Sequence, residues 1–192
     1  MTDTKSILLV GVGGQGTILA SKLLTIGLMQ SGYDVKMSEI HGMSQRGGSV
    51  SSQVRYGSDV QSPVIELGSA DILVSFEKME ALRWMEYLRT DGKVVVNDYQ
   101  INPMPVVSGI ADYSDKILDE LRAKAADVIV VKAFDEAVAL GNPKVLNIVL
   151  LGTIVKMMNL TDINWNDIIS SEVKANFVEL NQRALARGVE LV

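Results

Sequence analysis

Two glycine-bearing segments near the amino terminus contain the residues best suited to bind a ligand. The first, Gly11–Gly16, follows the pattern G-x-G-x-x-G. In that pattern the first glycine allows a tight turn, the second lets another group approach the backbone, and the third lets a helix pack on a strand. The N–H groups at the start of the following helix favour an anion. The candidate cofactor-binding residues here are Gly11, Gly13, Gly14, Gln15 and Gly16.

The second segment, His41–Val50, reads HGMSQRGGSV. Its arginine, Arg46, has a planar guanidinium group that suits a carboxylate or a phosphate, and the two glycines after it permit a tight backbone. Histidine side chains exchange a proton near neutral pH, so His41 is suited to donate a hydrogen bond or to shuttle a proton. We take His41 and Arg46 as catalytic candidates, and as binding candidates Ser44, Gln45, Arg46, Gly47 and Gly48.

Each of these residues also has a purely structural interpretation. The glycines of the first segment can serve packing alone, with no nucleotide bound. Arg46 can pair with a local acid such as Glu39, as arginines in loops commonly do. A single histidine is commonly a structural hydrogen-bonding residue. The residues alone leave both interpretations open.

The elements that position these segments alternate between strands and helices. Apolar and alternating runs predict strands over Ile7–Val10, Val35–Ile40, Ser49–Tyr56, Asp71–Phe76, Lys93–Asn97 and Asp127–Lys132. We expect Ser49–Tyr56 to be half-exposed because its polar and apolar residues alternate. Helices are predicted over Thr17–Gln30, Lys78–Leu88, Ser114–Ala126, Phe134–Leu140, from Asn142 onward and over Asp162–Arg187.

This order predicts the α/β class: a Rossmann-like, mostly parallel sheet with helices on both faces and a helical C-terminal third. We expect residues 1–192 to form one domain. Both glycine-bearing segments follow strands, and ligands usually bind at the carboxyl ends of the strands in such a sheet. The two segments are therefore expected to lie near each other.

Composition excludes several classes of protein. The chain has 192 residues, no cysteine, one histidine and a net charge of −5. Without cysteine it forms no disulfide and holds no Cys-ligated zinc or iron–sulfur cluster, and we expect no metal site. Its acidic balance argues against nucleic acid, which needs clustered basic residues. We see no signal peptide and expect a cytoplasmic protein. Residues 145–160 fall short of the ~20 needed to span a bilayer, so we expect a buried helix and no membrane association.

Together, GVGGQG after the first strand and EIHGMSQRGGSV after the second resemble the gamma subunit of 2-oxoacid:ferredoxin oxidoreductases. The HGMSQRGGSV form looks most like the beta subunit of the indolepyruvate type. Later pieces also fit: Ser62–Pro63, Asp71–Val74 and Gly141–Pro143. The resemblance covers nearly the whole chain.

The resemblance implies that the complete enzyme decarboxylates a 2-oxoacid, such as an arylpyruvate, on thiamine diphosphate. It passes electrons through 4Fe–4S clusters to ferredoxin and forms an acyl-CoA, with coenzyme A as co-substrate. Thiamine diphosphate and the clusters are expected on a large alpha subunit, and none on this chain. The isolated chain is then expected to be inactive.

Two other functions remain open on the residues alone. A free-standing NAD(P)-dependent oxidoreductase is suggested by the glycine pattern together with Glu39, which stands where an NAD enzyme carries its ribose-binding acid. A non-enzymatic nucleotide-binding assembly domain would use the same turn. Saturable binding of NADH by the isolated chain distinguishes these functions from the subunit.

Overall fold

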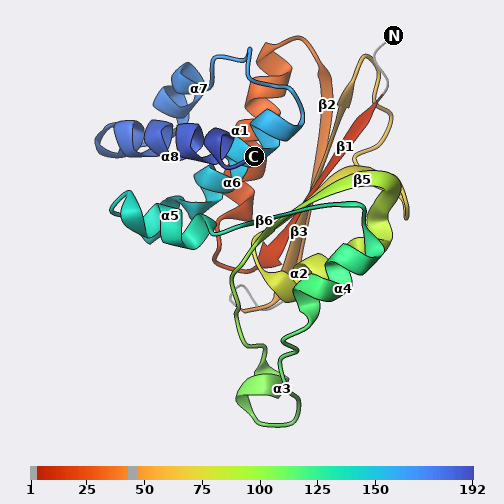
Figure 1. Cartoon of the computed structure of the whole chain (residues 1–192). Coiled ribbons are helices and arrows are strands. Elements are labelled where there is room, and N and C mark those ends of the chain that lie inside the picture. The colour runs from red at the N-terminus through yellow and green to blue at the C-terminus, as the bar shows by residue number, and fades with distance from the viewer. Residues whose placement is uncertain (1–3, 43–46) are drawn as a thin grey trace.

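A six-stranded sheet forms the centre of the molecule in the computed structural model, which describes residues 4–42 and 47–192 (Figure 1). The strand order is β2-β3-β1-β4-β5-β6. The pairs β1–β4, β4–β5 and β5–β6 are parallel. The strands are β1 (Lys5–Val12), β2 (Asp34–His41), β3 (Ser49–Gly57), β4 (Ala70–Ser75), β5 (Leu88–Asn97) and β6 (Asp127–Val131). The α/β class and the mostly parallel sheet are thus confirmed.

Helices cover both faces of this sheet, as Figure 1 shows. On one face lie α1 (Thr17–Gln30), α5 (Ala133–Ala139), α6 (Leu146–Met157), α7 (Trp165–Glu172) and α8 (Val178–Glu190). On the other face lie α2 (Lys78–Arg83) and α4 (Ile117–Lys124). The short helix α3 (Met104–Val107) sits on a segment that projects from the body, and the 3-10 turns are η1 (Met85–Tyr87), η2 (Pro143–Val145) and η3 (Ala175–Phe177).

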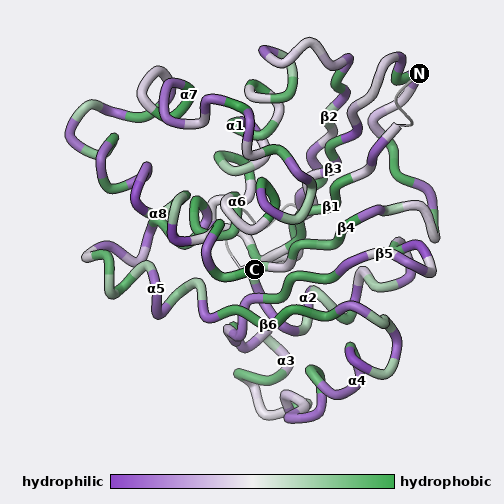
Figure 2. Tube along the Cα trace, turned by 45° about the horizontal axis from the view of Figure 1, so that its top comes forward, coloured by the Kyte–Doolittle hydropathy of each residue, from purple (hydrophilic) through white to green (hydrophobic). Residues whose placement is uncertain are grey.

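Strand β1 shows why both faces need a cover. Its residues from Ser6 to Val12 are all buried, and successive side chains point to opposite faces of the sheet. Ile7 and Leu9 belong to the core beneath α1 and α6, whereas Leu8 and Val10 belong to the core beneath α2 and α4. The hydrophobic colour that runs along most of β1 and β4 and along the second half of β5 in Figure 2 reflects this double burial.

Strand β3 departs from the sequence prediction. It runs antiparallel between β1 and β2, so it is an interior strand. The expectation of a half-exposed strand was wrong, because Ser51, Ser52 and Gln53 are all buried. One of these polar groups is satisfied by a distant loop, since Gln53 Oε1 accepts a hydrogen bond from the Ile65 N–H at 2.6 Å.

The helix predicted over Lys78–Leu88 was also too long. Helix α2 ends at Arg83, a 3-10 turn follows, and Leu88 already begins β5. Asp91 and Gly92 lie inside that strand. A side chain at Gly92 would stand 2.6 Å from Leu88 Cδ1, so the bare backbone lets Leu88 fold over it.

Helix α6 is the buried helix expected between residues 145 and 160. Every residue from Leu146 to Val155 is buried. It crosses α8 so closely that a Cβ atom on Gly188 would lie 1.9 Å from the Val149 carbonyl oxygen. Helix α6 has 12 residues. Within the described parts of the chain, the structure contains no helix with the length and apolarity that a bilayer span requires.

Strand β3 is antiparallel to both of its neighbours, β1 and β2. Strand β2 therefore points the same way as β1 and the strands parallel to it. The carboxyl ends of β1, β2, β4, β5 and β6 therefore meet at one edge of the sheet. Both glycine-bearing segments begin at this carboxyl edge, in the last residues of β1 and of β2.

Candidate functional site

The two glycine-bearing segments are joined by backbone hydrogen bonds at the carboxyl edge. The Gly13 N–H donates to the Gly48 carbonyl at 2.8 Å, and the Gly47 N–H donates to the Gly13 carbonyl at 3.4 Å. These bonds extend the β1–β3 ladder past its last pair, Val12 and Ser49. The expectation that the segments lie near each other is confirmed. The predicted residues Ser44, Gln45 and Arg46 lie outside the described residues.

Gly11 and Gln15 join the ends of two strands. The Gln15 side chain accepts a hydrogen bond from the Val12 N–H at 2.8 Å and donates one to the Phe76 carbonyl at 3.0 Å. A Cβ atom on Gly11 would lie 2.9 Å from Gln15 Oε1 and 2.9 Å from Phe76 Cβ. The bare backbone at Gly11 therefore makes room for this bridge between β1 and β4.

Gly16 and Gly14 both have left-handed backbone conformations, with φ of 84° and 106°. Gly16 packs against Asn147 of α6, whose Nδ2 donates to the Gly16 carbonyl at 3.2 Å. A Cβ atom on Gly16 would lie 2.7 Å from that nitrogen, whereas one on Gly14 would meet nothing within 4 Å. Gly14 is thus the part of the turn that is open to another molecule.

The start of α1 favours an anion. Its N-cap residue is Gly16, which offers no side-chain cap, and no acidic residue occupies the first helical turn. The first N–H groups of a helix lack partners within the helix, and the helix dipole is positive at this end. An anion beside Gly14 and Gly16 would interact favourably with both.

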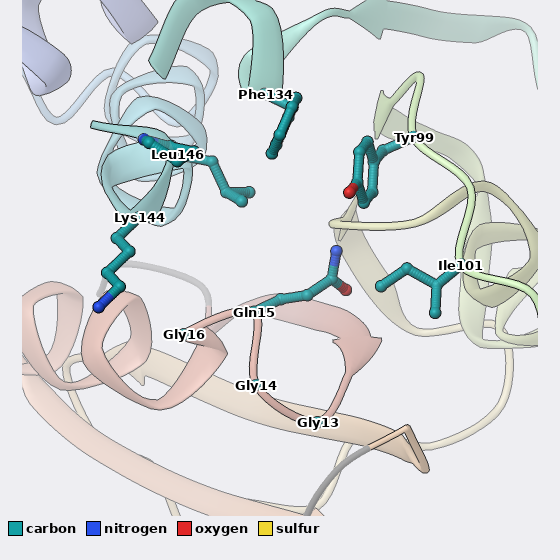
Figure 3. Close-up of a pocket in the computed structure, with 10 residues that line it drawn as sticks. Gly13, Gly14, Gln15, Gly16, Tyr99, Ile101, Phe134, Lys144 and Leu146 are labelled. Atoms are coloured by element: carbon teal, nitrogen blue, oxygen red, sulfur yellow. The ribbon is translucent and has the colours of Figure 1, made fainter. Parts of the chain in front are cut away.

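Two hollows flank the first glycine segment and share Gly13, Gly14 and Gly16. The first, of about 560 Å³, also has an apolar wall that includes Tyr99, Phe134 and Leu146, and Lys144 stands at its rim. Figure 3 shows Gln15 and the glycines on one side, with Tyr99 and Ile101 facing Phe134 and Leu146. The rings of Tyr99 and Phe134 stack with centroids 4.7 Å apart. This hollow combines a flat apolar wall with a cationic rim.

The second hollow, of about 400 Å³, is lined by His41, Ile18 and Val50 besides the glycines. His41 is exposed, and its Nδ1 lies 3.4 Å from the Gly42 carbonyl. Glu39, the acid considered for a ribose, lies within hydrogen-bonding distance of Ser21, 3.2 Å from its hydroxyl. Strand β3 separates the strand of Glu39 from β1, whereas a dinucleotide fold places these two strands side by side.

Two buried carboxylates, Glu77 and Glu80, lie at the start of α2. Glu77 accepts hydrogen bonds from the Glu80 N–H at 3.0 Å, from the Ile101 N–H at 3.2 Å and from the Tyr113 hydroxyl. Burial raises the pKa of Tyr113 above its ordinary value, and the hydrogen bond to Glu77 raises it further. Glu77 therefore fixes both ends of the projecting segment 101–113, which we call the arm.

Sequence reasoning missed several of these residues. Tyr99, Phe134, Lys144 and Asn147 come from segments far from the glycines in the chain, and none belongs to a recognisable motif. One signal was present for Lys144 and Asn147: Asn142–Pro143 marks the start of a helix, and helix starts at a carboxyl edge border the ligand region. Asn142 does cap this start, accepting a hydrogen bond from the Lys144 N–H at 3.0 Å.

Comparison with known proteins places the chain among oxidoreductase subunits. It is 37% identical to "Indolepyruvate oxidoreductase subunit IorB" of Thermococcus kodakarensis, over 96% of this chain and 94% of that protein. It is 36% identical to the protein of the same name from Archaeoglobus fulgidus, over 95% of this chain and 92% of that protein.

Among solved structures, the keto/oxoacid ferredoxin oxidoreductase gamma subunit of Geobacter sulfurreducens has the same fold. It is 22% identical with a TM-score of 0.70, and 97% of each chain is covered. A 2-oxoglutarate:ferredoxin oxidoreductase chain from Magnetococcus marinus is 16% identical with a TM-score of 0.77. In that comparison 98% of this chain corresponds to 31% of the longer one.

The family comparison agrees with the resemblance drawn from the two glycine-bearing segments. Residues 6–191 match the family described as pyruvate ferredoxin/flavodoxin oxidoreductase, which is nearly the whole chain. The match includes both segments, the carboxyl edge and the helical C-terminal third. This chain belongs to the pyruvate ferredoxin/flavodoxin oxidoreductase family.

Proposed function

We propose that this chain is the cluster-free subunit of an arylpyruvate:ferredoxin oxidoreductase of the indolepyruvate type, acting in the cytoplasm as a single domain. The observation that carries the proposal is the joined pair of glycine segments beside an open hollow, in a chain of this family that has no cysteine. A chain without cysteine cannot hold iron–sulfur clusters by their usual thiolate ligands. The electron carriers therefore belong to a partner.

The reaction of the whole complex defines what this chain must support. The bond between C1 and C2 of a 2-oxoacid breaks, CO₂ leaves, and the acyl carbon bonds to the sulfur of coenzyme A, whose thiol releases its proton. Two electrons pass through 4Fe–4S clusters to two ferredoxin molecules. Thiamine diphosphate, held with the clusters by the large alpha subunit, would supply the electron sink that decarboxylation needs.

In this proposal the carboxyl edge holds an anionic group for the partner's active site. The first turn of α1 and Lys144 attract negative charge, and Arg46 adds a guanidinium group from the second segment. The stacked Tyr99 and Phe134 supply a flat apolar wall. The anion is the 2-oxoacid carboxylate or a phosphate of coenzyme A. His41, at the rim of the second hollow, donates a hydrogen bond or moves a proton.

The arm supports a role as a subunit. Three of its large apolar side chains, Met104, Val107 and Ile110, are 74%, 65% and 83% exposed. Residues at the arm's base, Ile101 and Pro103, line hollows at the carboxyl edge. A large subunit that covers this edge would also cover the arm and remove its apolar side chains from water, which favours association.

The test is co-expression of this chain with the large subunit under anaerobic conditions. We expect a stable complex that reduces ferredoxin or a viologen dye when both a 2-oxoacid and coenzyme A are present. Arylpyruvates should give higher kcat/KM than pyruvate or 2-oxoglutarate. A complex that is inactive with every 2-oxoacid, although its thiamine diphosphate and clusters are intact, would contradict the proposal.

The glycine pattern also keeps an NAD(P)-dependent oxidoreductase, or a nucleotide-binding assembly domain, as the alternative. Titration of the isolated chain with NADH distinguishes them from the subunit. We expect no saturable binding, because the acid expected to hold the ribose, Glu39, lies on β2, and β3 separates β2 from β1. Saturable binding at micromolar NADH, or oxidation of a substrate by the chain alone, would favour the alternative.

A further inference from the structure

A second carboxylate of α2, Glu80, fixes the end of the second glycine segment. Glu80 is 5% exposed. Its Oε2 accepts a hydrogen bond from the Ser49 hydroxyl, and its Oε1 accepts one from Arg83 Nε at 3.2 Å. The Trp84 indole N–H donates a hydrogen bond to the Ser49 hydroxyl oxygen, with Nε1 3.5 Å from that oxygen. Ser49 is thus held by two side chains from the far side of the sheet.

The position of Ser49 makes this contact consequential. Gly47 and Gly48 have no side chains, so Ser49 is the first residue after them whose side chain can anchor the segment. Its backbone pairs with Val12, and the next residue pair carries the bonds between Gly13 and Gly48. A shift of Ser49 would therefore move the Gly48 carbonyl relative to Gly13, and with it the wall shared by both hollows.

We propose that Glu80 is a positioning residue, which acts through Ser49 to hold the two glycine-bearing segments in register at the carboxyl edge. Glu80 does not line either hollow that flanks Gly14, so it acts on a ligand there through the backbone and not by contact. The consequence for catalysis rests on the proposed function, whereas the consequence for the backbone does not.

The backbone consequence is measured on the full isolated chain, by NMR hydrogen exchange of the Gly13 N–H. We expect Glu80→Ala and Ser49→Ala to speed its exchange at least tenfold, roughly the factor that corresponds to losing one hydrogen bond to a charged group. Ser49→Thr keeps a hydroxyl on a β-branched side chain suited to a strand and should restore slow exchange. Glu86→Ala, at an exposed glutamate in the following 3-10 turn, is the matched control.

Unchanged Gly13 exchange in both Glu80→Ala and Ser49→Ala would overturn the proposal. If Glu80→Ala does not fold, Ser49→Ala still decides the question, because it removes a single hydroxyl from a partly exposed residue. Slow exchange of the α6 amides in each variant shows that any change at Gly13 is local.

The catalytic consequence is measured on the complex with the large subunit. We expect Ser49→Ala to raise KM for coenzyme A or the 2-oxoacid several-fold with kcat little changed, and Ser49→Thr to restore KM. A merely structural defect would lower the amount of active complex and leave KM alone, which would overturn the catalytic part. Failure of the proposed function is distinguishable, because then the unmodified complex is inactive while Gly13 exchange still responds to Ser49→Ala.

Discussion

The contact between Gly16 and Asn147 allows a sharp test of how the first glycine segment is built. Gly14 and Gly16 both have left-handed φ values, so alanine at either position incurs a similar backbone strain of about 1–2 kcal/mol. At Gly14 the new methyl group meets nothing within 4 Å. The free energy of unfolding should therefore fall by that strain alone in Gly14→Ala.

Gly16→Ala should cost more, because its methyl group would lie 2.7 Å from Asn147 Nδ2. Asn147 must move away, although it is buried, and its hydrogen bond to the Gly16 carbonyl is lost. Overpacking adds about 1–3 kcal/mol and the lost hydrogen bond about 1 kcal/mol. The total is about 3–6 kcal/mol, and each kcal/mol lowers Tm by roughly 2–4 °C in a chain of this size.

The assay is urea unfolding of five chains: the unmodified protein, Gly14→Ala, Gly16→Ala, Asn147→Ala and the double variant with alanine at both Gly16 and Asn147. Removing the Asn147 amide removes the two closest contacts and leaves the Cβ atom of Asn147 at 3.3 Å, so Gly16→Ala should cost much less in the Asn147→Ala background than in the unmodified chain, and close to what Gly14→Ala costs there. Such non-additivity is the mark of a direct contact. Equal costs of Gly16→Ala in both backgrounds would show that Asn147 does not constrain the turn, and the reasoning would be wrong.

Three further predictions concern the core, the second segment and pH. In Gly188→Ala the new Cβ would lie 1.9 Å from the Val149 carbonyl oxygen, so the free energy of unfolding should fall by about 2 kcal/mol even after the gain in helix propensity. The control is Gly42→Ala, whose Cβ would meet open space and which should leave the melting temperature unchanged. Arg46→Ala should raise KM for the 2-oxoacid or coenzyme A in the complex, and unchanged KM for both would remove Arg46 from the site. The control is Arg122→Ala, at an exposed arginine that pairs with Asp119. A hydrogen bond from Arg187 holds the pKa of Glu136 below its ordinary value, so this pair stabilises the fold above that ordinary value and the stabilisation is lost as pH falls through the lowered pKa. Glu136→Gln should therefore melt slightly lower than the unmodified chain at about pH 7, the difference should shrink as the pH falls below the ordinary pKa of a glutamate, and a pH-independent difference would refute the assignment.

The fold was predictable where a segment's pattern has one physical solution. The apolar, β-branched run of β1 suits a strand covered on both faces, and the helix over Thr17–Gln30 has the predicted bounds. The position of β3 was not predictable from its own residues. Alternating polar side chains suggest solvent on one face, but here Gln53 is satisfied by the distant Ile65 N–H, and the Ser51 hydroxyl is buried with no hydrogen-bond partner among the described residues. Long-range contacts decided the burial of this strand.

The candidate site was predictable in its backbone and not in its side chains. Glycine patterns record local constraints, so the sequence indicated both segments and the strand ends that bring them together. Tyr99, Phe134 and Lys144 become neighbours only through the order of β4, β5 and β6 in the sheet. Glu80 appears in the sequence as an ordinary residue of the predicted helix and Glu77 as the residue before it, and their burial follows from where α2 packs.

The structure also divides the glycines of the first segment into two kinds of position. Gly11 and Gly16 are bare because Gln15, Phe76 and Asn147 need the space, so these two glycines would be required even if no ligand bound. Gly14 has no such neighbour, and its open backbone faces both hollows. A glycine pattern at this turn is therefore weak evidence for a nucleotide, since packing accounts for two of its three defining glycines. Ligand binding has to be sought at Gly14, where a side chain would intrude on the ligand and not on the fold.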